Sequence, residues 1–285
     1  MNKKKKSSLM LRTLKKMLGN KLAMAGLVIF IIMVLAAAAA PLITRYDPSA
    51  LDLTSIAKPP GAEHWFGTDK LGRDVFTQVI YGGRVSIYVG VVGALLGAAI
   101  GMVLGCIAGF FGGKVDALIV RASELFLTFP NMILILMLAS LFGQSVNNIV
   151  LIFAFTGWMT TFRMVRNEFL SLREETYVLV CRAFGIPSVS IMFRHILPNI
   201  LNPIFVSLTL NVAGYILQGA SLSFLGLGVP VTTPTWGNIM NAAKSLDVIA
   251  NNWWLWFFPG VAISLFVMAT NFLGDGLRDV LDPRQ

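Results

Sequence analysis

The chain has 285 residues, of which 56% are hydrophobic and only 13% are charged, and its mean hydropathy is +0.73. A soluble globular domain carries about 25% charged residues, so this composition excludes an ordinary soluble protein and favours one embedded in a bilayer. The net charge of +9 does not indicate a nucleic-acid partner, because the basic residues flank apolar segments without an aromatic platform for bases.

Six apolar segments are candidates for membrane-spanning helices. A helix needs about 20 apolar residues to cross the hydrocarbon region. The fourth segment is short, and the third carries Pro130 within its first turn, where a missing N–H costs little. The sequence therefore predicts an all-α membrane protein with six transmembrane helices. They are expected at about residues 22–43, 85–111, 125–142, 149–164, 200–225 and 254–273.

The Lys and Arg residues are distributed unevenly between alternate segments. With the basic tail over residues 1–21 in the cytoplasm, 17 of the 23 Lys and Arg residues fall on the cytoplasmic side, as the positive-inside rule requires. Both termini are then cytoplasmic. The first apolar segment is longer than the core of a signal peptide, so it is expected to remain as an anchor. A cluster of Trp253, Trp254 and Trp256 at the outer start of the sixth helix is typical of an interfacial aromatic belt.

An external loop of about 40 residues is expected within residues 22–84, after the first helix. Thr68 or Asp69 could cap a short helix there, because apolar residues follow at helical spacing. The pattern predicts an amphipathic helix near the membrane surface. The apolar positions are Leu71, Val75, Val79 and Ile80.

Glycines recur at every fourth position along the second predicted helix. Small residues four apart lie along one side of a helix and allow a second backbone to approach closely. The pattern predicts tight helix packing, against a partner permease or within the chain, and does not by itself identify a transport path. The glycines are Gly93, Gly97, Gly101, Gly105, Gly109 and Gly113.

A long cytoplasmic loop at residues 166–199 is built for a partner. It should begin as a continuation of the fourth helix, break at Gly185-Ile186-Pro187, and restart with Ser188 as a cap. Two short amphipathic helices with a turn would then project into the cytoplasm. The basic residues of this loop serve either topology or partner contact, and the sequence leaves both open. They are Arg166, Arg173, Arg182 and Arg194.

Sites for catalysis, metals and nucleotides are not readable in the sequence. His64 and His195 are predicted on opposite sides of the membrane, so a structural role for His64 outweighs metal binding. Gly112-Gly113-Lys114 is followed by Val115 and does not complete a phosphate-binding G-x-x-x-x-G-K-[ST] loop. We therefore expect no enzyme activity, no cofactor and no metal in this chain.

Several motifs taken together resemble one transporter family. The loop residues Ala183-Phe184-Gly185 and His195-Ile196-Leu197-Pro198-Asn199 resemble the loop that ABC-importer permeases carry. GTDKLGRDVF at 67–76, SFLGLGVP at 223–230, Trp236-Gly237 and FLGDGLRDVLDPR at 272–284 are similar to the second permease subunit of dipeptide, oligopeptide and nickel importers. Where the general loop pattern has Glu-Ala-Ala, this chain has Leu179-Val180-Cys181.

The resemblance implies a type I ABC importer fold, with a permease core at 85–275 and a cytoplasmic end at 276–285. It implies a bacterial inner-membrane location, a second homologous permease, two ATPase subunits and an external binding protein. ATP and Mg²⁺ would be bound by the ATPase subunits. A coupling helix would contact one ATPase. Its residues would be Arg182, Ala183, Phe184, Gly185, Ile186, Pro187, Ser188 and Val189.

The substrate and its path are the least determined features. Asn211, Gln218 and Ser221 on the fifth helix are candidates for a weakly binding pore lining, or for hydrogen bonds between helices. The expected substrates are oligopeptides or dipeptides, with nickel or a metal chelate as the alternative. A stand-alone secondary carrier is disfavoured because the spans lack embedded charges and broken repeats. A membrane enzyme is disfavoured because no catalytic cluster occurs at usable spacing.

Overall fold

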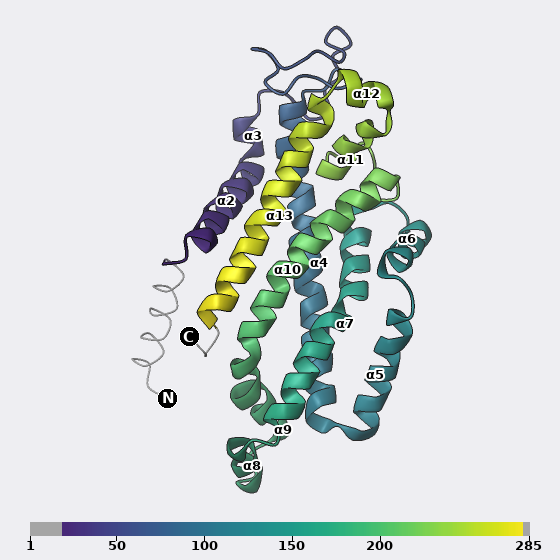
Figure 1. The fold of residues 1–285 in the computed structure, drawn as a ribbon. Helices are drawn as coiled ribbons and strands as arrows, with labels where there is room; N and C mark the ends of the chain where they lie inside the picture. Colours follow the sequence, from purple (N-terminus) through teal and green to yellow (C-terminus); the bar gives the residue numbers. More distant parts are fainter. Residues whose placement is uncertain (1–18, 282–285) are drawn as a thin grey trace.

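A computed structural model describes residues 19–281, in which helices are joined by irregular segments (Figure 1). Most of the predicted basic tail, and Arg284, lie outside these residues. The elements are α2 (Lys21–Ala38), α3 (Ala40–Ile43), α4 (Val75–Phe111), α5 (Gly113–Leu127), α6 (Asn131–Phe142), α7 (Val146–Leu172), α8 (Thr176–Ala183), α9 (Ser188–Ser190), the π-helical turn η1 (Ile191–Ile196), α10 (Leu197–Leu225), α11 (Trp236–Met240), the 3₁₀ turn η2 (Asn241–Lys244), α12 (Leu246–Asn251) and α13 (Trp254–Leu281).

The long helices form an elongated bundle. Five spans, carried by α2, α4, α7, α10 and α13, are long and apolar enough to cross a membrane, and α5 with α6 would make a sixth. Counted in this way, residues 19–281 hold six spans, and the prediction of an all-α membrane protein with six transmembrane helices is confirmed. Figure 1 shows α8 at one end of the bundle and α11 and α12 at the other, beside the irregular segment that precedes α4. We call these the α8 end and the loop end.

The third predicted helix, at residues 125–142, is not a single straight helix. Its residues belong to the end of α5 and to α6, and these two helices meet at an angle of 86°. α5 ends at Leu127, and Pro130 precedes α6 with a backbone ψ of 123°. Proline lacks an N–H and its ring clashes with the preceding turn, so it does not continue α5. The start of α5 escaped prediction because charged residues interrupt its apolar run. These are Lys114, Asp116, Arg121 and Glu124.

The predicted amphipathic helix outside the membrane does not form as a separate element. Its apolar residues from Val75 onward are the first turns of α4, which begins there rather than at residue 85. Asp74 is the cap, and its carboxylate accepts a hydrogen bond from the Thr77 N–H at 2.8 Å. Thr68 and Asp69 bond instead within the irregular segment that precedes α4. The predicted helical spacing is confirmed for Val75, Val79 and Ile80, whereas Leu71 lies before the helix and the predicted cap is wrong.

Two buried polar contacts attach that irregular segment to the bundle. His64 Nδ1 lies 2.9 Å from the Asp74 carboxylate, and both side chains are buried. Trp254 Nε1 donates a hydrogen bond to the Thr68 carbonyl oxygen at 3.0 Å. Trp254 is therefore a core residue that is 4% exposed, whereas its neighbour Trp253 is 45% exposed. The prediction of an interfacial belt is wrong for Trp254, because the irregular segment before α4 covers it.

The glycines of α4 allow this helix to approach α7 of the same chain. A Cβ atom at Gly101 would lie 2.4 Å from the Trp158 carbonyl oxygen, and one at Gly105 would lie 2.7 Å from the Val165 Cβ. Real Cβ contacts are not this short, so side chains at these positions would separate the helices. Gly113 does not belong to the series, because it begins α5 with φ +56°. The glycines that face α7 are Gly93, Gly97, Gly101, Gly105 and Gly109.

Candidate functional site

A short helix and a turn project from the α8 end of the bundle (Figure 1). α7 ends at Leu172, and α8 is a separate helix, so the predicted continuation of the fourth helix stops earlier than expected. A turn over residues 184–187 follows α8. Gly185 adopts φ +72°, and its N–H donates to the Arg182 carbonyl oxygen at 2.9 Å. We call α8 and this turn the α8 knob.

The predicted coupling helix is displaced from the helix in the structure. Residues 182–189 comprise the last turn of α8, the turn itself and the start of α9, whereas the continuous helix is Thr176–Ala183. Ser188 is the first residue of α9 rather than its cap, and no side chain caps that helix. The break at Gly185-Ile186-Pro187 is confirmed, because left-handed backbone followed by proline ends α8.

One face of the α8 knob packs into the bundle. Val178 is 0% exposed and belongs to an apolar cluster with Phe169 of α7 and Ile191 of η1. Cys181 and Ile186 pack against the same cluster. Residues 178 and 181 lie on one helix face because they are three apart. Val178 is not among the residues predicted from the sequence, although the apolar spacing of Val178 and Cys181 is a signal for this buried face.

The other face of the α8 knob is apolar and exposed. Exposed aliphatic and aromatic side chains are common singly, but a cluster on a protruding element marks an interaction surface. These side chains contribute nothing to the apolar clusters of the bundle. They are Phe184 (82% exposed), Leu179 (48%) and Val180 (47%), and Val189 of α9, which follows the α8 knob, is 63% exposed.

The three predicted pore-lining residues lie on α10, and one of them, Ser221, lines a groove. Ser221 borders a groove of about 530 Å³ between α10 and α13, together with Gly260 and Ser264 of α13. The Ser221 hydroxyl also donates to the Leu217 carbonyl oxygen at 2.8 Å. Gln218 is outside this lining, and its buried Oε1 has no hydrogen-bond partner among the described residues.

Asn211 is half-buried and also lies outside the groove lining. Ser264 and Gly260 escaped the sequence analysis, because their place beside α10 depends on how the two helices pack.

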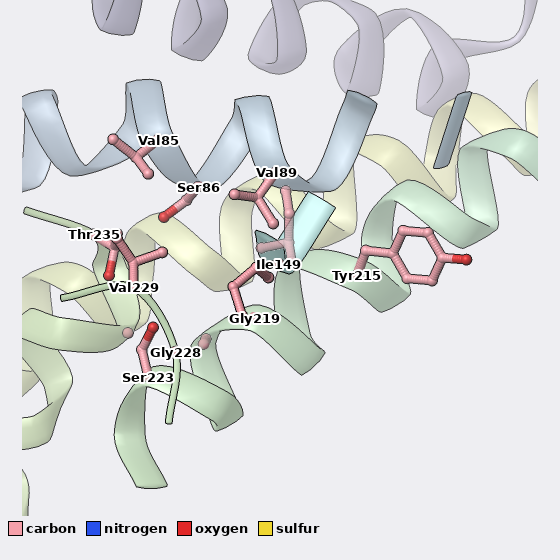
Figure 2. A pocket seen from close by; sticks show the side chains of 13 residues that line it. Val85, Ser86, Val89, Ile149, Tyr215, Gly219, Ser223, Gly228, Val229 and Thr235 are labelled. Atoms are coloured by element: carbon pink, nitrogen blue, oxygen red, sulfur yellow. The ribbon is translucent and has the colours of Figure 1, made fainter. Parts of the chain in front are cut away.

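A second pocket, between α4, α10 and the segment after α10, is too small for a substrate. Figure 2 shows Ser86 and Val89 of α4 facing Gly219 of α10, while the ring of Tyr215 points away from them. Its volume of about 20 Å³ has room for about one water molecule. Ser86 Oγ accepts a hydrogen bond from the Trp236 N–H at 3.2 Å. This pocket is a packing junction of the core.

Comparisons with known proteins converge on one family. The family described as "Binding-protein-dependent transport system inner membrane component" matches residues 101–285, and "N-terminal TM domain of oligopeptide transport permease C" matches residues 8–60. A Brucella suis protein named as a peptide permease is 42% identical over 275 residues, covering 96% of this chain and 91% of the relative.

Two relatives from Bacillus subtilis are similar over nearly the whole chain. The oligopeptide transport system permease protein OppC is 38% identical over 281 residues, covering 99% of this chain and 92% of OppC. The dipeptide transport system permease protein DppC is 40% identical over 273 residues, covering 96% of this chain and 84% of DppC.

Proposed function

The chain belongs to the family of binding-protein-dependent transport system inner membrane components, and on that premise we propose that it forms half of an ATP-driven import pore for peptides. It is a multi-pass transmembrane component and not the ATPase of the system. The observation that carries the proposal is the α8 knob, which is anchored in the core on one face and apolar and exposed on the other.

The proposed partner of the α8 knob is an ATPase subunit in the cytoplasm. An energy source outside this chain is needed, because the sequence contains no phosphate-binding loop. The excess of Lys and Arg on one side of the predicted topology supports a cytoplasmic α8 end and cytoplasmic termini. The ATPase would contact exposed side chains between Arg182 and Val189, the residues that the family resemblance implies for coupling. The absence of Glu-Ala-Ala favours an apolar contact, centred on Phe184.

Replacing Phe184 with alanine should weaken ATPase binding without destabilising the permease. Truncating a central aromatic side chain at an interface costs about 2 kcal/mol, which is roughly 30-fold in affinity. Because Phe184 is 82% exposed, its loss leaves no cavity in the bundle. The measurement is the affinity of the detergent-solubilised permease pair for its purified ATPase subunits, with the thermal unfolding midpoint of the permease measured in parallel.

A matched control is Leu246→Ala, because Leu246 is also 82% exposed but lies on α12 at the loop end. ATPase affinity should be unchanged in that variant. Equal affinities of the Phe184→Ala variant and the unmodified protein would contradict the assignment of the α8 knob. Since the ATPases are cytoplasmic, the same experiment tests the orientation.

Peptides are the proposed substrates because the relatives are named for them. OppC and DppC of Bacillus subtilis carry oligopeptide and dipeptide in their names, and their similarity extends over both the permease region and the first helix. No observation on the described residues favours a nickel chelate over a peptide. A second, homologous permease would complete the pore, and an external binding protein would deliver the peptide at the loop end.

The proposed pore lining is the polar side of α10, at Asn211, Gln218 and Ser221. Polar side chains on a membrane helix are expected to face the protein interior or a water-filled path. A cysteine at position 221 should react with a membrane-impermeant maleimide, and reaction should slow when saturating peptide and the binding protein are present. Ala213→Cys is the matched control, because Ala213 is buried on the same helix.

Labelling of the unmodified protein measures the background from Cys106 and Cys181. Reaction at position 221 no faster than at position 213 would show that this side of α10 is closed to water.

A further inference from the structure

Three arginines at the α8 end contact α4 or α5. Arg166 lies on α7, Arg173 follows the last residue of α7, and Arg182 lies on α8. The sequence left membrane topology and partner contact as their possible roles. A fourth arginine of the same region, Arg194, is exposed. The contacts of the first three indicate a different role.

Arg166 attaches the beginning of α5 to α7. Its guanidinium forms a two-pronged ion pair with Asp116, in which Nη2 lies 2.5 Å from Oδ2 and Nε donates to Oδ1. The two side chains are 24% and 16% exposed, so water screens them less than a surface pair. Paired forks of this kind fix orientation as well as distance. Arg166 Nη1 also lies 3.4 Å from the Asn167 side-chain oxygen.

Arg173 attaches the end of α4 to the segment between α7 and α8. Its Nη1 donates to the Gly109 carbonyl oxygen at 3.2 Å, and its Nε donates to Glu174 at 3.0 Å. The last carbonyls of a helix have no partner within the helix and favour a cation. A Cβ atom at position 112 would lie 2.8 Å from this guanidinium. Gly112 therefore provides the space that Arg173 occupies, in addition to the φ +65° that turns the chain from α4 into α5.

Arg182 attaches α8 itself to the end of α4. Its guanidinium carbon lies 4.9 Å from the centroid of the Phe110 ring, which is a favourable cation–π distance. Phe110 is 6% exposed and shares the apolar cluster that contains Val178. The three arginines thus contact the last turn of α4 and the first turn of α5 from three successive positions along the α7–α8 segment.

We propose that Arg166, Arg173 and Arg182 are positioning residues that make the α4–α5 turn move with the α8 knob. Val178 connects the knob to α7 and η1, and the arginines add a connection to α4 and α5. If an ATPase displaced the α8 knob, the movement would then be transmitted to α4 as well as to α10. The glycine face of α4 would allow this helix to move along α7. This inference rests on the proposed function.

The test compares Arg173→Ala with Arg194→Ala in the complete transporter, reconstituted in proteoliposomes with its ATPases and binding protein. Both variants remove one positive charge at the same end, but only Arg173 contacts α4. The measured quantity is the number of peptides transported per ATP hydrolysed. We expect roughly a tenfold fall in this ratio for Arg173→Ala and no change for Arg194→Ala. Arg173→Lys, which keeps a charged donor, should recover part of the loss.

A charge exchange tests the ion pair between Arg166 and Asp116. Asp116→Asn should lower the ratio, and the double variant Asp116→Arg with Arg166→Asp should restore part of it, because the exchange keeps opposite charges facing each other. The assembled complex is isolated before each assay, so the ratio reports coupling rather than the amount of folded protein.

Several outcomes would overturn the inference. Equal ratios for Arg173→Ala and Arg194→Ala, or ATP hydrolysis falling in parallel with transport so that the ratio is constant, would each show that the contacts do not transmit movement. Peptide uptake by the unmodified complex distinguishes failure of this inference from failure of the proposed function. Absence of ATP-driven peptide uptake by the unmodified complex would contradict both, whereas uptake with unchanged ratios in the variants would contradict only this inference.

Discussion

Replacing Gly101 with leucine is expected to destabilise the permease more than any other single substitution considered for this chain. A Cβ atom at this position would lie 2.4 Å from the Trp158 carbonyl oxygen and 2.8 Å from the Phe162 backbone nitrogen. Backbone atoms of a packed helix cannot rotate away as a side chain can, so α4 and α7 must separate. Overpacking of this kind costs about 3 kcal/mol. The measurement is the thermal midpoint for loss of the monodisperse protein in detergent.

Gly214 provides a matched control within a second long helix. A Cβ atom there would meet nothing within 4 Å. The smaller change to alanine makes the comparison sharper, because alanine favours a helix over glycine by about 1 kcal/mol wherever space permits. Gly214→Ala should therefore be neutral or stabilising, whereas Gly101→Ala should lower the midpoint. Equal midpoints for the two variants would contradict the close α4–α7 contact.

Replacing Gly185 with proline is expected to abolish transport while the protein still inserts into the membrane. The backbone at Gly185 has φ +72°, and its N–H donates to the Arg182 carbonyl oxygen. Proline fixes φ near −65° and has no N–H, so the turn of the α8 knob must change its path. The apolar residues on either side would then lose their common surface. Co-purification of the ATPase subunits and ATP-driven uptake should be lost together.

Asparagine at the same position is the control that isolates the backbone effect. It adopts the left-handed conformation more readily than other residues with a side chain, and nothing lies within 4 Å of a Cβ at Gly185. Gly185→Asn should therefore keep most of the transport activity. Full activity in the proline variant would show that the geometry of this turn is irrelevant to coupling.

The glycine series of α4 shows what the spacing of residues in a sequence can predict and what it cannot. Its spacing correctly indicated close helix packing, because the side of a helix on which residues lie depends only on their separation. The identity of the neighbour was open, and a partner permease was one possibility. The structure assigns α7 of the same chain. Gly113 matched the spacing but not the helix, because Gly112 ends α4 one residue earlier.

The segment predicted to be the coupling loop also combines features that the sequence predicts with features that it does not. Gly185 and Pro187 correctly located the break, because these residues restrict the backbone wherever they occur. The position of the short helix depended on where α7 ends and on Val178 entering the apolar cluster, and both follow from packing. The roles of Arg166, Arg173 and Arg182 were equally beyond the sequence, since their partners Asp116, Gly109 and Phe110 are about 50 to 70 residues away along the chain.

The sequence by itself determined the class of this protein, its apolar spans and the motifs that identify its family, because length, composition and local backbone preferences depend on nearby residues. Only the tertiary structure decided that α4 starts at Val75, that Pro130 divides one span into two helices, and that Trp254 is buried under the irregular segment before α4. The burial of Trp254 depends on contacts with residues far away in the chain, such as its hydrogen bond to the Thr68 carbonyl oxygen. Such contacts form only when the bundle closes.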